Sequence, residues 1–508
     1  MRMNLSELKN TAAWAERAVA LPRHDVQAMI SKTKAAPRWV HFGTGNIFRG
    51  FIASLAQRIL GDGSADSGII AAETFDYDII DSIFVPNDNL TMNVTLKADG
   101  GMDCEVIASI AEAIRVDTQI DRLKEIFAMP SLQMASFTIT EKGYTVFDGN
   151  AMDIVTDMLY ARYKAGAFPI AMVSMDNCSA NGDRIKSCVL EFAARKNDPG
   201  FTAWLNDPSK VSFPWSMIDK ITPRPAKAVE DLLSQKGIEG MAPIITSKKT
   251  FIAAFVNAER PQYLVIEDAF PNGRPALDKA GVIFTDRETV SKTERMKVTT
   301  CLNPLHTAMA VYGCLLGYDL ICEEMKDADI VALIKRLGYI EGLPVVVDPG
   351  ILSPKKFIDE VVSERLPNPF MPDAPQRIAT DTSQKVGIRY GETVKSYIEG
   401  GRSLDALVSI PLAIAGWLRY LLAVDDKGAE MEVSADPMKD ALQAKLSGVV
   451  WNDPSSYAGQ LMTILTDAQI FGLDLTATPL AKRIEGYFVS MLGGVGAVRE
   501  TLHREINA

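Results

Sequence analysis

The chain has 508 residues, of which 47% are hydrophobic and 23% are charged. This composition excludes a disordered chain, a collagen-like fibre and a small disulfide-stabilised scaffold. The 53 Lys and Arg residues are outnumbered by 64 Asp and Glu residues, which gives a net charge of −11. That charge argues against a nucleic-acid partner, because proteins that bind phosphate backbones are usually basic.

Metal sites and membrane segments are also disfavoured. The six cysteines form no C-x-x-C pair and there are only four histidines, so we expect no metal site. The N-terminal segment lacks the continuous apolar core of a signal peptide. The most apolar stretch, 406–418, is shorter than the roughly 20 residues that a membrane span requires. We therefore expect a cytoplasmic protein that does not enter a membrane.

Strands and helices alternate in the first half of the chain. Short apolar runs predict buried strands at 39–42, 68–73, 134–140, 171–175 and 263–266. Between the first two runs, apolar residues recur at helical spacing from Phe51 to Leu60. Alternating strands and helices predict a mostly parallel sheet that is covered on both faces.

The second half has mainly helical patterns. We expect helices at 302–316, 329–337, 404–424 and 480–492, and one strand at 343–347. The change of pattern predicts an α/β domain over residues 1–290 and a mostly α-helical domain over residues 291–508.

A glycine-rich turn follows the first predicted strand. Gly43 and Gly45 lie between the strand and the next helix, an arrangement in which backbone amides and the helix dipole can receive a pyrophosphate. Glu73 ends the next predicted strand, where a carboxylate can accept hydrogen bonds from the adenine ribose and favour NAD over NADP. The third glycine of the usual fingerprint is absent, because Phe48 occupies its position. A plain structural turn is the alternative explanation.

Several further segments follow in order. They are 41–49 (HFGTGNIFR), 138–144 (TITEKGY), 174–177 (SMDN), 216–223 (SMIDKITP), 265–268 (VIED), 273–275 (GRP) and 377–385 (RIATDTSQK). Together they resemble the polyol-specific long-chain dehydrogenase family, also called the mannitol dehydrogenase family. The resemblance implies a Rossmann-like NAD-binding domain, a helical C-terminal domain and hydride transfer without a metal. It also implies cofactor contacts from Gly43, Gly45, Asn46, Ile47, Phe48, Arg49 and Glu73.

The resemblance further implies a catalytic Lys–Asn–His set, which here is Lys297, Asn303 and His306. Oxidation of a secondary alcohol needs a base for the hydroxyl proton, and a buried lysine can take that role. Asn303 and His306 can donate hydrogen bonds to the developing alkoxide. Glu294, one helical turn before Lys297, is implied as a proton-path residue.

The spacing of this set departs from the family. Lys297 and Asn303 are six positions apart rather than five, and Pro304 replaces a glycine. On a regular helix Lys297 and His306 would point about 180° apart, against about 80° at the family spacing. We therefore expect an irregular turn between Val298 and Pro304, because a π-bulge accommodates one extra residue and Pro304 disrupts helical hydrogen bonding.

The substrate contacts implied by the family are Asn177, Asp219, Arg377 and Lys385. Asn177 and Asp219 suit hydroxyl groups, and Arg377 can meet a carboxylate through two parallel hydrogen bonds. Arg389, one turn beyond Lys385, adds to the positive charge, although a solvated surface residue is an equal alternative there.

These observations predict an NAD-dependent dehydrogenase that interconverts a linear sugar acid or polyol and its keto form. The basic residues favour the mannonate/fructuronate pair, and a mannitol or arabinitol 2-dehydrogenase is the alternative. Two other classes remain open: a redox-neutral epimerase or isomerase that retains NAD, and a nucleotide-binding protein without catalysis. We expect a monomer or a small homo-oligomer.

Overall fold

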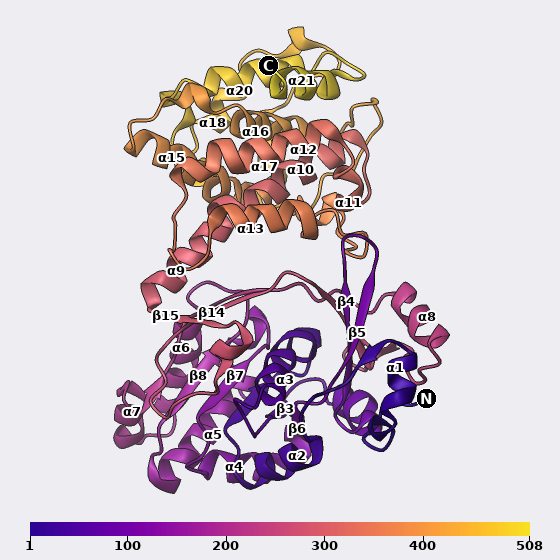
Figure 1. Ribbon diagram of the computed structural model, residues 1–508. Helices are drawn as coiled ribbons and strands as arrows, with labels where there is room; N and C mark the ends of the chain where they lie inside the picture. Colours follow the sequence, from indigo (N-terminus) through magenta and orange to yellow (C-terminus); the bar gives the residue numbers. More distant parts are fainter. The chain divides into compact units, whose positions relative to one another are not determined.

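The computed structural model describes residues 1–508 and comprises two compact units, Met1–Ser291 and Lys292–Ala508. The first unit is α/β and the second is helical (Figure 1). This confirms the predicted fold class.

A six-stranded parallel sheet forms the centre of the first unit. In spatial order its strands are β6 (Ile110–Arg115), β3 (Ile69–Glu73), β2 (Trp39–Phe42), β7 (Met134–Phe137), β8 (Ile170–Ser174) and β9 (Val211–Ser212). Numbered along the chain within this sheet, the order is 3-2-1-4-5-6, which is that of dinucleotide-binding folds. The strand order reverses between β2 and β7, and ligands bind beside the carboxyl ends of strands at such a point.

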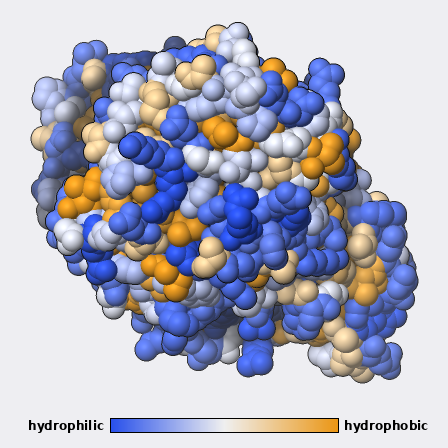
Figure 2. Space-filling view, turned by 90° about the horizontal axis from the view of Figure 1, so that it is seen from above, coloured by the Kyte–Doolittle hydropathy of each residue, from blue (hydrophilic) through white to orange (hydrophobic).

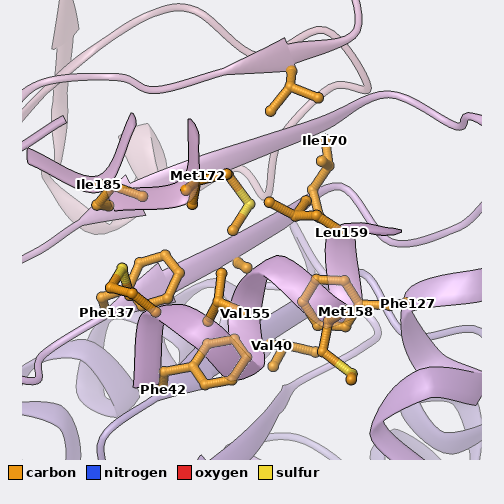
Figure 3. Close-up of a cluster of buried hydrophobic side chains, with 14 of the residues drawn as sticks. Val40, Phe42, Phe127, Phe137, Val155, Met158, Leu159, Ile170, Met172 and Ile185 are labelled. Carbon is orange, nitrogen blue, oxygen red and sulfur yellow. The ribbon is translucent and has the colours of Figure 1, made fainter. Parts of the chain in front are cut away.

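Both faces of this sheet are buried. Successive residues of a strand point to opposite faces, so one strand contributes side chains to two cores. Val40 and Phe42 of β2 join a core that contains Phe127, Val155 and other residues of the helices on one face (Figure 3). Trp39 of β2 belongs to a second core on the other face. The near-continuous apolar runs of the strands follow from this two-sided burial.

The helices of the first unit connect and cover these strands. They are α1 (Thr11–Glu16), α2 (Val26–Ala35), α3 (Ala53–Gly61), α4 (Val116–Ala128), α5 (Ala151–Gly166), α6 (Asn181–Ala194), α7 (Pro199–Asn206) and α8 (Lys227–Gln235). Helix α9 (Arg287–Met296) contains the division between the units.

Three smaller sheets complete the first unit. They contain β1 (Val19–Ala20), β5 (Met102–Ile107), β4 (Thr91–Leu96) and β13 (Phe255–Glu259); β10 (Ser216–Asp219), β14 (Tyr263–Glu267) and β15 (Ile283–Thr285); and the hairpin of β11 (Ile244–Ile245) and β12 (Phe251–Ile252). The antiparallel pair β4–β5 was not among the strands expected from the sequence.

The second unit is built around two buried helices, α10 (Asn303–Leu316) and α16 (Ser409–Tyr420), which pack on each other. The buried carboxylate of Glu341 caps α16 by accepting the backbone N–H groups of Val408, Ser409 and Ile410. The other helices are α11 (Ile321–Glu324), α12 (Ala328–Lys335), α13 (Pro354–Glu360), α14 (Pro375–Ile378), α15 (Glu392–Glu399), α17 (Lys439–Lys445), α18 (Met462–Leu465), α19 (Ala468–Phe471), α20 (Leu480–Ser490) and α21 (Ala497–Ile506).

The strand expected at 343–347 is wrong. A π-helical segment, Arg336–Gly342, continues directly into a 3₁₀ turn at Leu343–Val345. Pro344 occupies an early position of that turn, where its fixed φ suits a helix and its missing N–H costs nothing.

The surface is a mosaic of polar and apolar groups. The face drawn in Figure 2 carries separate hydrophobic patches among hydrophilic residues. None of the helices is long and apolar enough to span a lipid bilayer.

Candidate active site

The turn after β2 has the geometry of a phosphate-binding loop. Gly43 has a φ of +95°, and a Cβ atom there would lie 2.3 Å from the carbonyl oxygen of Thr138. Only glycine therefore lets this turn lie against the residue that follows β7. A Cβ atom on Gly45 would meet nothing within 4 Å, so the backbone there borders open space. These two glycines fit a dinucleotide, because a phosphate group can approach the turn closely.

The next helix begins at Asn46. Its first backbone N–H groups have no partner inside the helix, and together with the helix dipole they favour an anion at the turn. Asn46 and Ile47 are half-buried in this first turn, which is the position their predicted cofactor contacts require. The chain then forms a π-helical turn at Phe48–Ile52 and continues into α3.

The side chains of Phe48 and Arg49 make contacts within the protein. Both are completely buried. Phe48 stacks on His41 with ring centroids 4.2 Å apart. Arg49 donates hydrogen bonds to the backbone oxygen of Ala253 at 2.8 Å and to Oδ1 of Asn46 at 2.9 Å. These two side chains therefore hold the helix in place, and their contacts with a cofactor stay predictions.

Glu73 ends β3 as predicted, but its carboxylate is occupied by the protein. Oε2 accepts hydrogen bonds from the backbone N–H and the hydroxyl of Thr44. Oε1 accepts the backbone N–H groups of Thr74, Phe75 and Asp76 at 3.1, 2.9 and 3.1 Å. Five internal hydrogen bonds leave this carboxylate little capacity for a ribose. Glu73 holds the glycine turn and its own loop together, and its contact with the adenine ribose stays a prediction.

Asp176 plays a similar part at the ends of β7 and β8, and the sequence reasoning missed it. Its carboxylate accepts the backbone N–H groups of Ile139 and Thr140 at 2.8 and 3.0 Å and the hydroxyl of Tyr144 at 2.7 Å. Burial raises the pKa of Asp176 and also that of Tyr144. Thr140 has a φ of +62°, which is strained for a β-branched residue. Asp176 thus holds a strained loop beside the dinucleotide turn. The segments around 138–144 and 174–177 were the available signal.

Two predicted substrate contacts also belong to the first unit. Asn177 follows Asp176 and is exposed. Asp219 ends β10 and is 5% exposed. Their contacts with a substrate stay predictions.

The second unit contains the irregular turn that the spacing predicted. Lys297–Cys301 forms a π-helical turn, and Leu302 leaves the helical conformation with φ −128° and ψ −63°. Helix α10 then starts at Asn303, with Pro304 in its first turn. The backbone N–H of Leu302 donates to the carbonyl of Lys297 at 3.1 Å, five residues earlier. The expectation is confirmed: the extra residue changes the helical phase between Lys297 and His306.

The three predicted catalytic residues flank this turn. Lys297 is 5% exposed, and Asn303 is half-buried. Burial lowers the pKa of His306 to about 4, so its imidazole is neutral at pH 7. The Nε2 atom of His306 is buried and has no hydrogen-bond partner. The carboxylate of Asp373 lies 3.7 Å from it, which is too far for a hydrogen bond. A buried imidazole nitrogen without a partner is suited to a polar ligand.

Three arginine side chains act electrostatically on His306, and two of them also act on Lys385. Positive charges on Arg389, Arg377 and Arg365 act on His306. Burial lowers the pKa of Lys385, and the charges of Arg389 and Arg377 lower it further. Arg389 donates to the hydroxyl of Thr307, the residue after His306. The structure therefore gathers Arg377, Lys385 and Arg389 into one electrostatic cluster. Such a concentration of positive charge favours an anionic ligand.

Arg365 was missed by the sequence reasoning. It is 4% exposed and ends a π-helical segment at Val361–Arg365. No motif or spacing connects it with Arg377, so the sequence contained no signal for it. Glu294, the predicted proton-path residue, is half-buried on α9, and its role stays a prediction. No group of three or more His, Cys, Asp or Glu residues is arranged to hold a metal ion.

Comparison with known proteins identifies relatives over the whole chain. Residues 37–279 match the family model described as the mannitol dehydrogenase Rossmann domain, and residues 289–489 match the mannitol dehydrogenase C-terminal domain. A D-mannonate oxidoreductase of Thermotoga maritima is 48% identical, and the alignment covers 100% of this chain and 99% of that protein. A mannitol 2-dehydrogenase of Phaeosphaeria nodorum is 28% identical over 80% of this chain and 72% of that protein.

Two solved structures share the fold. Mannitol 2-dehydrogenase of Pseudomonas fluorescens, in a ternary complex with NAD and D-mannitol, aligns with a TM-score of 0.70 and 24% identity over 100% of both chains. A D-sorbitol dehydrogenase in substrate-free form aligns with a TM-score of 0.79 and 24% identity, covering 96% of this chain and 97% of that one.

Proposed function

The chain belongs to the mannitol dehydrogenase family, and we propose that it interconverts D-mannonate and D-fructuronate by hydride transfer with NAD. It is an NAD-dependent dehydrogenase that acts on a secondary alcohol. The 48% identity to a D-mannonate oxidoreductase over the full length favours the sugar acid over a neutral polyol, because the mannitol 2-dehydrogenase of Phaeosphaeria nodorum is 28% identical.

The observation that carries this proposal is the cationic cluster beside His306. Arg365, Arg377 and Arg389 act on one neutral imidazole, and Lys385 lies close enough to Arg377 and Arg389 to be affected by their charge. A neutral polyol has no group that needs several cations, whereas a sugar acid has a carboxylate that Arg and Lys side chains bind well. With the neutral substrate of the alternative, a mannitol or arabinitol 2-dehydrogenase, Asp373, which pairs with Arg377, would be the carboxylate beside these cations.

NAD accepts or supplies the hydride when it is bound. In the first unit the backbone around Gly43, Gly45 and Asn46 would hold its phosphate groups, because that backbone borders open space at a helix N-terminus. Residues 1–290 thus serve the cofactor, and residues 291–508 supply the catalytic side chains.

The chemistry needs a proton acceptor and hydrogen-bond donors. Lys297 takes the hydroxyl proton during oxidation and returns it during reduction. Asn303 and the neutral His306 donate hydrogen bonds to the substrate oxygen as negative charge develops on it. The buried Nε2 atom of His306 has no partner in the protein, which supports this role. Asn177, Asp219, Arg377 and Lys385 complete the proposed substrate contacts, and Glu294 relays the proton.

We also propose a cytoplasmic location and a monomer or small homo-oligomer. No disulfide joins any of the six cysteines and five of them are buried, which suits a reducing compartment.

The decisive experiment follows NADH consumption by absorbance with fructuronate, tagaturonate and fructose. We expect the fastest oxidation with fructuronate, and a loss of at least about a hundredfold in kcat for Lys297→Ala. Lys326→Ala is the matched control, because Lys326 only forms a surface ion pair with Glu323. A preference for fructose would favour the polyol alternative. Conversion of a substrate without any change in NADH would favour the epimerase.

A further inference from the structure

An aromatic side chain stands exposed at the carboxyl end of β3. Phe75 lies two residues beyond Glu73 and is 65% exposed, although its neighbours Glu73 and Asp76 are buried. In sheets of this strand order, the residues that follow the second strand contact the adenosine half of a bound dinucleotide. Phe75 is therefore an apolar ring at the position where an adenine base would be received.

A second loop brings a lysine to the same ring. The Nζ atom of Lys248 lies 5.2 Å from the centroid of Phe75. Lys248 belongs to the turn of the β11–β12 hairpin, whose Thr246 and Thr250 hydroxyls both donate hydrogen bonds to the buried carboxylate of Asp76. The backbone N–H of Ser247 donates to Asp78 at 2.7 Å. The hairpin is thus tied to the loop that carries Phe75.

The backbone of the loop that carries Phe75 is also held by Glu73. The carboxylate of Glu73 accepts the backbone N–H groups of Thr74, Phe75 and Asp76. A carboxylate offers no flat surface on which an adenine base can stack, so another group has to serve the base. Arg115, which pairs with Glu73 across β3 and β6, is itself engaged by Asp81 and Asp117. Phe75 and Lys248 remain as the exposed pair at this edge of the sheet.

We propose that Phe75 is the adenine platform of the dinucleotide site, with Lys248 bracing the ring. A pre-positioned aromatic ring stacks on a base without first having to become ordered. This inference rests on the proposed function, because it assumes that the first unit binds NAD. It assigns the contact with the adenine base to Phe75.

Calorimetric binding to the intact protein tests the assignment, with NADH, ADP-ribose and reduced nicotinamide mononucleotide as separate ligands. We expect Phe75→Ala to weaken ADP-ribose and NADH binding by about tenfold, the usual loss for one base stack. Binding of the mononucleotide, which has no adenine, should not change. Phe75→Tyr should keep the affinity of the natural protein, because it keeps the ring.

Ile245→Ala is the matched control, since Ile245 is a 70% exposed apolar residue on the same hairpin and should leave ADP-ribose binding unchanged. The inference is overturned if Phe75→Ala binds ADP-ribose normally, or if Ile245→Ala weakens it equally. It is also overturned if Phe75→Ala changes the sedimentation coefficient, because Phe75 would then serve contacts between copies of the chain. Absence of NADH binding by the natural protein would refute the proposed function itself.

Discussion

The two units present their functional groups in opposite ways. Around the glycine turn of the first unit, two buried carboxylates are used within the protein: Glu73 accepts five hydrogen bonds and Asp176 accepts three. Around His306 in the second unit, an imidazole nitrogen is buried without a partner and cations are gathered. The first unit therefore presents backbone groups and a closely fitted turn to a ligand, whereas the second presents charged side chains and a histidine nitrogen without a hydrogen-bond partner. Steric changes should damage the first most, and charge changes the second.

The largest effect should come from a steric change at the turn. Gly43→Ala places a Cβ atom 2.3 Å from the carbonyl oxygen of Thr138 and forces a φ of +95° on alanine. We expect a loss of about 3 kcal/mol or more in the free energy of unfolding. Gly45→Ala has open space around its Cβ and should keep its stability within about 0.5 kcal/mol while weakening NADH binding. Urea unfolding and NADH fluorescence titration measure the two effects. Equal stability of both variants would contradict this account of the turn.

A charge change in the second unit should act on substrate choice. Arg389→Met removes one cation beside His306 and Lys385. We expect kcat/KM for fructuronate to fall by about 30- to 100-fold, which corresponds to the free energy of one hydrogen bond to a charged group. Slow turnover of fructose should change little. Arg402→Met is the control, because Arg402 is an exposed residue of the same unit. An equal loss with both substrates would mean that Arg389 serves the fold through its bond to Thr307.

The neutral state of His306 predicts a pH dependence of stability. Burial lowers its pKa to about 4 from the ordinary 6.5, so the unfolded chain binds this proton more readily than the folded protein. The contribution of the neutral imidazole to the free energy of unfolding is fully present above pH 6.5 and is lost as the pH falls towards 4. His306→Gln should therefore lose less stability than the natural protein between pH 7 and pH 4.5 in urea unfolding. His503→Gln, at an exposed histidine, should follow the natural protein. Parallel curves for all three proteins would argue against a buried neutral imidazole.

The sequence predicted features that depend on local chemistry. The strand–turn–helix unit followed from Gly43, Gly45 and the apolar periodicity, and the irregular turn followed from the extra residue before Asn303 together with Pro304. Both are decided by residues close together in the chain. The expected strand at 343–347 failed, because an apolar run of this length fits a helical turn equally well and Pro344 favours the turn.

Features that depend on distant partners could not be predicted. Nothing near Glu73 indicates that Thr44, 29 positions earlier, would donate two hydrogen bonds to its carboxylate. Arg49 was assigned to the cofactor by its motif, but its partner is the backbone of Ala253. Arg365 joins the cluster of Arg377 and Arg389 only through the packing of separate helices. When tertiary packing forms a charge cluster, its residues have no regular spacing in the sequence from which the cluster could be predicted.

The smallest expected effect concerns Glu324, a buried carboxylic acid of the second unit that has no part in the proposed function. Glu324 is fully buried and neither carboxylate oxygen has a hydrogen-bond partner. Burial raises its pKa well above the ordinary value, so the folded protein holds the proton that the unfolded chain releases. Its stability contribution is complete at low pH and is lost as the pH rises above 4.5. Glu324→Gln should therefore stabilise the protein at pH 7 by on the order of 1 kcal/mol.

This gain should disappear as the pH falls to 4, where the natural side chain is neutral in both states. Glu323→Gln provides the matched control, because the carboxylate of Glu323 only pairs with Lys326 at the surface. Such surface pairs contribute little to the free energy of unfolding. Urea unfolding at pH 4 and pH 7 compares the three proteins. NADH oxidation by Glu324→Gln should match that of the natural protein, since Glu324 is not part of the cationic cluster. A destabilised Glu324→Gln at pH 7 would mean that an ionised carboxylate is required at this position.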